Sequence, residues 1–292
     1  MFSEFVMIVV GGLKMGAIYS LAAIGIVVIH KATRTVNFAH GALVLCGAYA
    51  TYGVVEVLQI GYWAAFVLAA VAAGLLAATL EFTILRPIRQ ADSFAVITAT
   101  IFIGIGLSDI YRLFQNTEML AVTGMVRGSP FFLGDAMITR EQIAVVVGAM
   151  VASVLGVAIF AYAKFGRGMR AMASNPRGAV LCGYSSDRMN GLAWFVGGAM
   201  AGLAGAFAAP STGVSAELSI MMITAGFAAA VIGGFDSLKG ALLGGLILGV
   251  AETLAAGYVS SAMKNAVSFL LIFIVLLYRP QGLFPEAKIR DV

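Results

Sequence analysis

Charged residues are scarce in this chain. Only 11% of its 292 residues are Asp, Glu, Lys or Arg, whereas 61% are hydrophobic, and the mean hydropathy is +0.99. A water-soluble domain is excluded, because no soluble fold buries so large an apolar fraction. The net charge of +4 does not indicate nucleic-acid binding, since the cations lie between apolar runs and form no basic stripe. The composition predicts an integral membrane protein in contact with a lipid bilayer.

Cysteine and histidine are rarer still. Cys46 lies in an apolar run and Cys182 in a basic segment, so no disulfide is predicted. His30 and His40 are not accompanied by Cys, Asp or Glu at metal-ligand spacing, so no metal site is expected. No nucleophile, base and orienting group occur together, and no Gly-x-x-x-x-Gly-Lys-Ser/Thr phosphate loop is present. We therefore expect no catalytic residues, no cofactor and no ATPase activity in this chain.

Long apolar runs dominate the sequence. Because a helix needs about 20 apolar residues to cross a bilayer, the runs predict an all-α polytopic membrane protein with about eight to nine transmembrane helices. The first residues lack the positive segment and cleavage site of a secretory signal, so the first run is expected to remain as a membrane anchor. The predicted spans are residues 5–29, 36–58, 63–85, 93–114, 141–162, 191–210, 218–233, 240–258 and 264–278.

Basic residues between the runs predict the orientation of the chain. Short cytoplasmic loops carry an excess of Lys and Arg, and this excess occurs at Arg34, at Arg86 and Arg89, and in the segment 164–190. The connection between the fourth and fifth spans has no such excess and is expected outside. The N-terminus is therefore predicted to lie outside the cytoplasm and the C-terminus inside it.

Two predicted spans are interrupted. The second opens with polar and glycine residues around Asn37, and the seventh is short and is followed by a glycine break. Gly-Ala-Leu follows both His40 and Lys239. Interrupted segments in both halves of a chain indicate a translocation site, whereas a helix start capped by Asn37 explains the first interruption equally well. The candidate substrate path comprises Asn37, Phe38, His40, Asp236 and Ser237, with Thr98 and Thr100 from the glycine-containing fourth span.

The main polar interruption is the basic segment, residues 164–190. A short helix is predicted over Met169–Ser174, and it ends at Asn175 because a proline disfavours helical geometry in the residue before it. A second helix is predicted to begin with Pro176 in its first turn and to be broken by Gly183. Two such helices form either a docking surface or a solvated connector whose charges only set the topology.

Five segments carry a likeness to a known family. They are Val36–Gly41 (Val-Asn-Phe-Ala-His-Gly), Gly47–Tyr49, the basic segment, Ala229–Leu242 and Tyr278–Phe284. In their sequences and in their order along the chain they resemble the shorter permease subunit of branched-chain amino acid ABC importers.

The resemblance implies one permease domain over residues 1–292, with a type II importer fold, in a bacterial inner membrane with a periplasmic N-terminus. It implies pairing with a longer paralogous permease, two cytoplasmic ATPases that bind ATP and Mg²⁺, and a periplasmic solute-binding protein. Many members carry an acidic residue where this chain has Ala42, and relatives carry urea, amides or aromatic acids, so the substrate stays open. The residues expected to couple to the ATPases are Gly168, Arg170, Ala171, Asn175, Pro176, Ala179 and Gly183.

Embedded charges leave a second hypothesis open. An ion-coupled secondary transporter with inverted repeats would use an acid such as Glu252 as its coupling group. Glu252 could equally pair with Lys14 or face a subunit interface. Asp109 and Arg112 are spaced to form an ion pair at a helix end.

Overall fold

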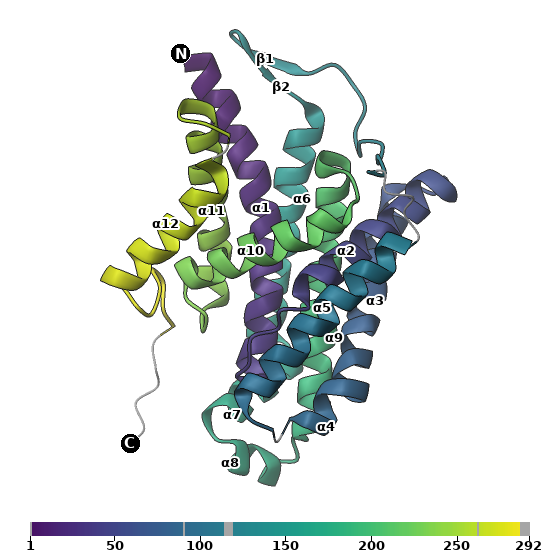
Figure 1. The fold of residues 1–292 in the computed structure, drawn as a ribbon, viewed down its shortest axis with the longest axis vertical. Helices are drawn as coiled ribbons and strands as arrows, with labels where there is room; N and C mark the ends of the chain where they lie inside the picture. The colour runs from purple at the N-terminus through teal and green to yellow at the C-terminus, as the bar shows by residue number, and fades with distance from the viewer. Residues whose placement is uncertain (1, 90, 114–118, 262, 287–292) are drawn as a thin grey trace.

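The protein is almost entirely helical. The computed structural model describes residues 2–89, 91–113, 119–261 and 263–286 (Figure 1). Apolar runs form helices here because a bilayer offers no hydrogen-bond partner to a free backbone N–H or C=O group. The elements are α1 (Phe2–Thr33), α2 (His40–Tyr52), the π-helical η1 (Gly53–Val57), α3 (Tyr62–Leu80), the π-helical η2 (Glu81–Leu85), α4 (Arg86–Ile88), α5 (Ser93–Leu113), β1 (Phe131–Leu133), β2 (Ala136–Ile138), α6 (Arg140–Tyr162), α7 (Lys164–Ser174), α8 (Pro176–Leu181), α9 (Ser186–Thr212), α10 (Ala216–Gly233), α11 (Leu238–Tyr258) and α12 (Met263–Tyr278).

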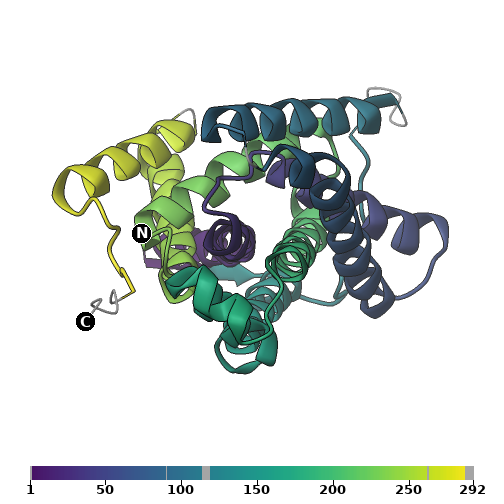
Figure 2. The same cartoon turned by 90° about the horizontal axis from the view of Figure 1, so that it is seen from below.

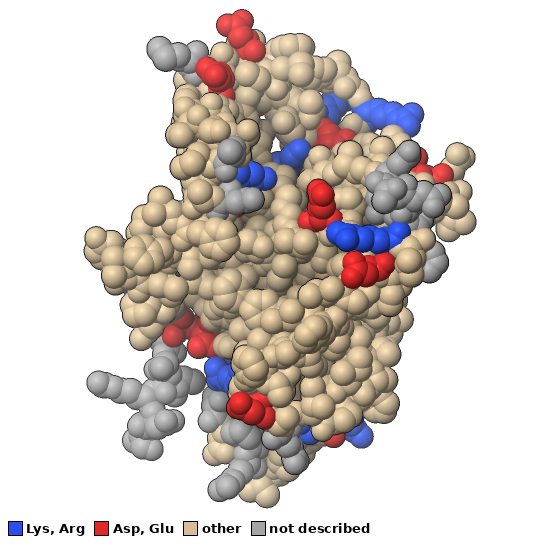
Figure 3. Space-filling view, viewed as in Figure 1, with Lys and Arg blue, Asp and Glu red and all other residues tan. Residues whose placement is uncertain are grey.

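The predicted spans all appear as helices. Seven helical stretches are long and apolar enough to cross a membrane, and the other two predicted spans correspond to α2 with η1 and to the shorter α12. The all-α polytopic fold class is thus confirmed. In the described residues, the only sheet is the hairpin of β1 and β2, which pairs Phe131 with Ile138 in the long connection before α6. Uncharged residues form most of the face in Figure 3, as a lipid-facing surface requires.

Helix α1 is the centre of the bundle. Its most apolar window is 83% buried, and it packs against α6, α9, α10 and α11, as the view from below illustrates (Figure 2). Glycines permit this close packing. A Cβ at Gly16 would lie 2.8 Å from the Cα of Leu246, and one at Gly249 would lie 2.3 Å from the backbone nitrogen of Gly16. Gly12 and Gly16, four residues apart on one face of α1, thus let this helix approach α11 closely.

The connecting loops lie at the two ends of the bundle, grouped as the basic residues predict. At one end, Arg89 pairs with Asp187 at 2.8 Å and Arg86 donates to the Asp187 carbonyl, so the third span ends beside the basic segment. At the other end, the long connection before α6 meets the turn between α9 and α10, where Leu120 and Val214 form a β-bridge. The chain thus alternates between two sides, and α4, α7 and α8 share one of them (Figure 1).

Helix α9 includes Pro210, continues to Thr212 and ends at Gly213, whose φ of +69° is left-handed and favours glycine. One predicted boundary is wrong. The first short helix of the basic segment begins at Lys164, five residues before the predicted start at Met169.

We expect Gly249→Val to weaken the fold. The added side chain would overlap the α1 backbone at Gly16, and overpacking of this kind costs about 1–3 kcal/mol in free energy of unfolding. Gly106→Val is the matched control, because nothing lies within 4 Å of a Cβ at that helical glycine. Thermal unfolding of the purified variants in detergent measures the difference. Equal melting temperatures would contradict the tight contact between α1 and α11.

Candidate functional site

The chain between α1 and α2 is not helical. It turns at Arg34, whose φ is +56°, and reaches His40 before a helix resumes (Figure 1). Asn37 is only 1% exposed, and its Oδ1 accepts a hydrogen bond of 2.9 Å from the backbone N–H of Ala39. Asn37 therefore closes the turn that leads into α2. It does not cap that helix, because the N-cap position is Ala39 and no side chain caps it, so the capping interpretation is wrong. The predicted interruption of this span is present.

Neighbouring helices enclose this interruption. The backbone N–H of Phe38 donates to Oγ1 of Thr100 on α5 at 3.2 Å, and its ring stacks on Phe227 of α10 with centroids 5.8 Å apart. A Cβ at Gly104 would lie 3.1 Å from the Cα of Ala39, so α5 also contacts the broken backbone directly. Protein thus supplies the partners that lipid cannot. Thr98, two residues before Thr100, is half-buried and has no hydrogen bond to the described residues.

His40 is fully buried at the start of α2. A Cβ at Gly25 of α1 would lie 2.6 Å from Cε1 of the imidazole and 2.6 Å from the carbonyl oxygen of Gly197 on α9. The ring therefore occupies space that Gly25 leaves free, and the missing side chain at Gly25 also lets α1 approach α9 closely. The structure brings Asn37, Phe38, His40 and Thr100 together in the core of the bundle, and in this conformation they are packed against protein.

Asp236 and Ser237 lie elsewhere, in the turn between α10 and α11. Oγ of Ser237 accepts from the N–H of Gly240 at 3.0 Å and caps α11. The carboxylate of Asp236 pairs with Arg34 at 3.1 Å, and its backbone carbonyl accepts from Nζ of Lys31 at 2.7 Å. The two interrupted segments thus meet through an ion pair at the basic end of the bundle.

The C-terminal tail closes this end of the site, which the sequence did not predict. Backbone N–H groups of Leu283 and Phe284 donate to the carbonyls of Ile232 and Gly233 at 2.8 and 3.1 Å. Glu286 forms an ion pair with Lys31. The tail therefore holds the end of α10, and the signal available in the sequence was the family-like run Tyr278–Phe284.

The basic segment is attached firmly to α6. The Arg170 guanidinium donates to the carbonyls of Phe160 and Ala161 at 2.7 and 2.9 Å, and it lies 5.9 Å from the Phe160 ring centroid. Arginine near a helix C-terminus satisfies carbonyls that have no partner within the helix. Arg170 thus fixes α7 to the end of α6. A Cβ at Gly168 would lie 2.6 Å from the Tyr184 ring, so α7 also packs closely on the chain leading into α9.

Helix α8 forms the tip of the segment. Oδ1 of Asn175 accepts from the N–H of Gly178 at 2.9 Å and caps the helix, which begins with Pro176 as predicted. The predicted break at Gly183 is confirmed, because its φ is +86° and its N–H donates to Val180. Ala171 is half-buried and Ala179 is only 4% exposed. Val180 and Leu181, in contrast, are 54% and 89% exposed.

Glu252 does not pair with Lys14, which is one of the partners considered from the sequence. Glu252 accepts a hydrogen bond from Tyr19 at 3.0 Å and another from Ser268, and it lies 4.0 Å from Lys264. The alternative pairing of Glu252 with Lys14 is therefore wrong. The charge of Glu141 at the start of α6 acts electrostatically on Lys14, although the two side chains form no ion pair within 4.0 Å. Residues this distant in the chain are joined by tertiary packing, which apolar periodicity does not reveal.

The predicted ion pair of Asp109 with Arg112 is present at 3.6 Å. Among the described residues no group of three or more His, Cys, Asp or Glu is arranged to hold a metal ion.

A buried helix interruption, two rigid helices at a basic end and multiple spans define a multi-pass transport protein. The family model for the branched-chain amino acid transport system permease component matches residues 8–276. The chain belongs to this family.

Individual relatives match over nearly their whole length. The high-affinity branched-chain amino acid transport system permease protein LivH of Escherichia coli is 30% identical over 305 residues, which cover 100% of this chain and 99% of LivH. LivH of Salmonella typhimurium gives the same identity and coverage. The corresponding protein BraD of Pseudomonas aeruginosa is 28% identical, with 97% and 96% of the two chains covered.

One solved structure shares the fold. A chain of PsaBC from Streptococcus pneumoniae in complex with Fab superposes with a TM-score of 0.50 at 15% identity, covering 96% of this chain and 97% of the other. The predicted fold of a type II importer permease is thus confirmed for the bundle.

We expect Thr100→Val to destabilise the protein through the broken segment. The substitution leaves the buried N–H of Phe38 without its acceptor, which costs about 1–3 kcal/mol. Thr98→Val, two residues away, is the matched control and should leave the melting temperature nearly unchanged. Detergent-solubilised thermal unfolding measures both. A stable Thr100→Val variant that no longer transports would instead assign Thr100 to the substrate path.

Proposed function

We propose that this chain forms, with a paralogous permease, the translocation path of an ATP-driven importer for branched-chain or other small amino acids or related solutes. Two cytoplasmic subunits would bind ATP and Mg²⁺, and a periplasmic solute-binding protein would deliver the substrate. The chain itself would serve as a transport subunit without enzymatic activity, in a bacterial inner membrane with its N-terminus periplasmic. The named relatives, all branched-chain amino acid permease proteins, support this substrate class.

The observation that carries the proposal is the exposure of apolar side chains at the tip of α8. Val180 and Leu181 expose apolar side chains at the end of the bundle that carries the basic residues. An apolar side chain that is 89% exposed outside the apolar spans gains most if a partner protein covers it. A purely solvated connector needs no such residues. We infer that the tip of α8 seats in a cleft of an ATPase.

The attachment of α7 supports a mechanical role. A partner must supply about 5.5 kcal/mol of differential binding to shift an equilibrium from 1:99 to 99:1. That energy reaches the spans only through a stiff connection. Arg170 provides one, because its two hydrogen bonds to Phe160 and Ala161 join α7 to the last turn of α6. Motion of the docked segment would then move α6, which packs against the central α1.

The site residues fit a path that opens by rearrangement. The interruption at the start of the second span contains Asn37, Phe38 and His40, and Thr100 of α5 contacts it. All four residues are packed against protein in this conformation. The Arg34 and Asp236 pair joins the two interrupted segments at the end that we propose faces the cytoplasm. Breaking that exposed pair costs little, so the segments can separate as the transporter opens inward.

Ion-coupled secondary transport remains the second hypothesis. It requires Glu252 to bind and release a proton or cation. In the structure Glu252 is held by Tyr19 and Ser268, and the ammonium group of Lys264, 4.0 Å away, competes with a coupling cation. The two hypotheses separate cleanly, because secondary transport persists in liposomes without an ATPase.

We expect Leu181→Glu to release the ATPase. The substitution places a charge where the proposed cleft is apolar, and it leaves the fold intact because the side chain is 89% exposed. Leu133→Glu is the matched control, since Leu133 is also an exposed leucine, 58% exposed, but lies in the hairpin at the opposite end. Co-purification of the tagged chain with its chromosomal neighbours measures the association. ATPase capture that is equal for both variants would contradict docking through α8.

A further inference from the structure

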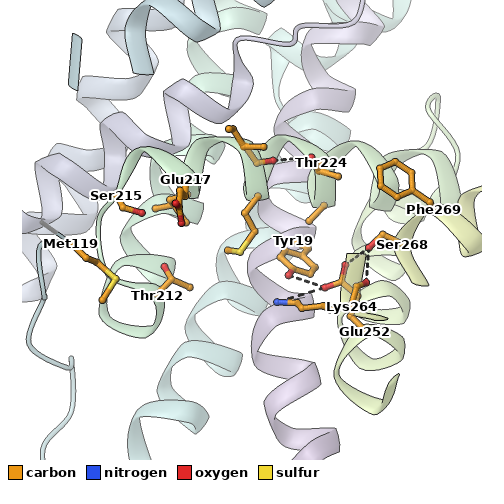
Figure 4. A pocket seen from close by; sticks show the side chains of 14 residues that line it. Tyr19, Met119, Thr212, Ser215, Glu217, Thr224, Glu252, Lys264, Ser268 and Phe269 are labelled. Carbon is orange, nitrogen blue, oxygen red and sulfur yellow. Dashed lines mark hydrogen bonds and ion pairs between the residues drawn. The ribbon is translucent and has the colours of Figure 1, made fainter. Parts of the chain in front are cut away.

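A pocket of about 520 Å³ lies between α1, α10, α11 and α12, apart from the broken segment (Figure 4). Its volume falls within the range of small-molecule sites, roughly 300–1,000 Å³. One wall is apolar, with Leu218, Met221 and Ala225 from α10 and Phe269 from α12. Such a mixture of one apolar wall and a few polar groups is typical of a site that binds a small amphipathic solute.

The polar end of the pocket is an acid held in a fixed position. Glu252 is 3% exposed, and its two carboxylate oxygens accept one hydrogen bond each, from Tyr19 and Ser268. A carboxylate offers about four acceptor positions, so each oxygen keeps one free. Figure 4 shows Tyr19 and Ser268 converging on Glu252 from two different helices. The acid is thus oriented and still able to accept hydrogen bonds from a ligand.

The basic partner is only loosely engaged. Nζ of Lys264 lies 4.0 Å from Glu252, which is beyond hydrogen-bond distance, and it donates no hydrogen bond to the described residues. All three N–H groups of the ammonium therefore remain available. An ionisable pair inside a membrane protein is costly and usually marks a substrate pathway. This pair presents a free anion acceptor and a free cation donor side by side.

A zwitterionic amino acid matches this arrangement. Its carboxylate would bind Lys264, its ammonium group would bind the free positions on Glu252, and an aliphatic side chain would lie against Leu218 and Met221. A solute with only one charge leaves either Glu252 or Lys264 unmatched, and an unmatched charge in a site of low polarity is costly. At the other end of the pocket Glu217 forms no ion pair with any described residue and adds attraction for the ammonium group.

We propose that the pocket between α1, α10, α11 and α12 binds the α-ammonium and α-carboxylate of an amino acid through Glu252 and Lys264. This inference rests on the proposed function and deepens it, because it gives the permease its own recognition of the zwitterion. The proposal also gives Glu252 a role that requires no coupling ion. The competing explanation is a purely structural tether that joins α1, α11 and α12.

The test is protection of a thiol in the pocket. Thr224 lines the pocket and its hydroxyl bonds only the carbonyl of Ile220 in its own helix, so Thr224→Cys is a mild change. It is introduced with Cys46→Ala and Cys182→Ser into the complete importer in lipid nanodiscs. Maleimide labelling is followed with leucine, with 4-methylpentanoate (carboxylate only) and with isoamylamine (ammonium only). Leu133→Cys in the outer hairpin serves as the control thiol.

Leucine at roughly ten times its Kd should slow labelling of the pocket thiol about tenfold, whereas the two single-charge analogues and the control thiol should show no protection. Lys264→Met should abolish the protection while the ATPase still co-purifies. Lys264 is suited to this substitution because its side chain is partly exposed, at 33%, and donates no hydrogen bond that the substitution would break.

Uptake of labelled leucine by the unsubstituted importer is measured in parallel. Uptake without protection, or protection that survives Lys264→Met, would overturn the pocket proposal and leave the proposed function standing. Equal protection by all three compounds would show apolar filling only and would also overturn it. Absence of uptake in the presence of the solute-binding protein and ATP would contradict the proposed function itself.

Discussion

The structure depends on the absence of water in the bilayer core. Every backbone N–H and C=O group there must find a partner within the protein, and this chain nevertheless leaves the helix before α2. The interruption is stable because α1 forms a buried centre and α5 and α10 close over it, with Thr100 accepting from Phe38 and Asn37 closing the turn. Glycines at Gly16, Gly25 and Gly249 permit the required contacts.

The same constraint explains how α7 and the C-terminal tail are joined to the membrane spans. A helix end in a membrane protein has carbonyls that need partners, and Arg170 reaches back from α7 to supply two of them at the end of α6. The C-terminal tail does the same for the end of α10 through Leu283 and Phe284. Satisfying backbone groups thus also fixes α7 and the C-terminal tail to the spans, which makes these elements suitable for transmitting movement.

Much of the architecture was predictable from residues alone. Apolar length locates the spans, the positions of Arg86, Arg89 and the basic segment place them on one side, and local chemistry at Asn175, Pro176 and Gly183 predicts the short helices of the tip. Each of these signals is local in sequence.

The unpredicted features all depend on contacts between different elements. The contact of Glu252 with Tyr19, Lys264 and Ser268, the return of Arg170 to α6 and the ion pair of Lys31 with Glu286 depend on how helices pack. Periodicity and composition do not specify which helix neighbours which. The interior placement of His40 is similar, since it requires a glycine on another helix, Gly25 of α1, to leave room for the ring.

The central claim is that the α7 and α8 tip faces the cytoplasm, and the native Cys182 tests it directly. Cys182 is exposed at the end of α8, so with Cys46→Ala it is the single thiol for a membrane-impermeant maleimide in cells lacking the partner ATPases. The account predicts that Cys182 is labelled only after the cells are permeabilised, whereas Leu133→Cys in a Cys182→Ser background is labelled in intact cells. Labelling of Cys182 in intact cells would contradict it, because no cytoplasmic ATPase could then reach the tip.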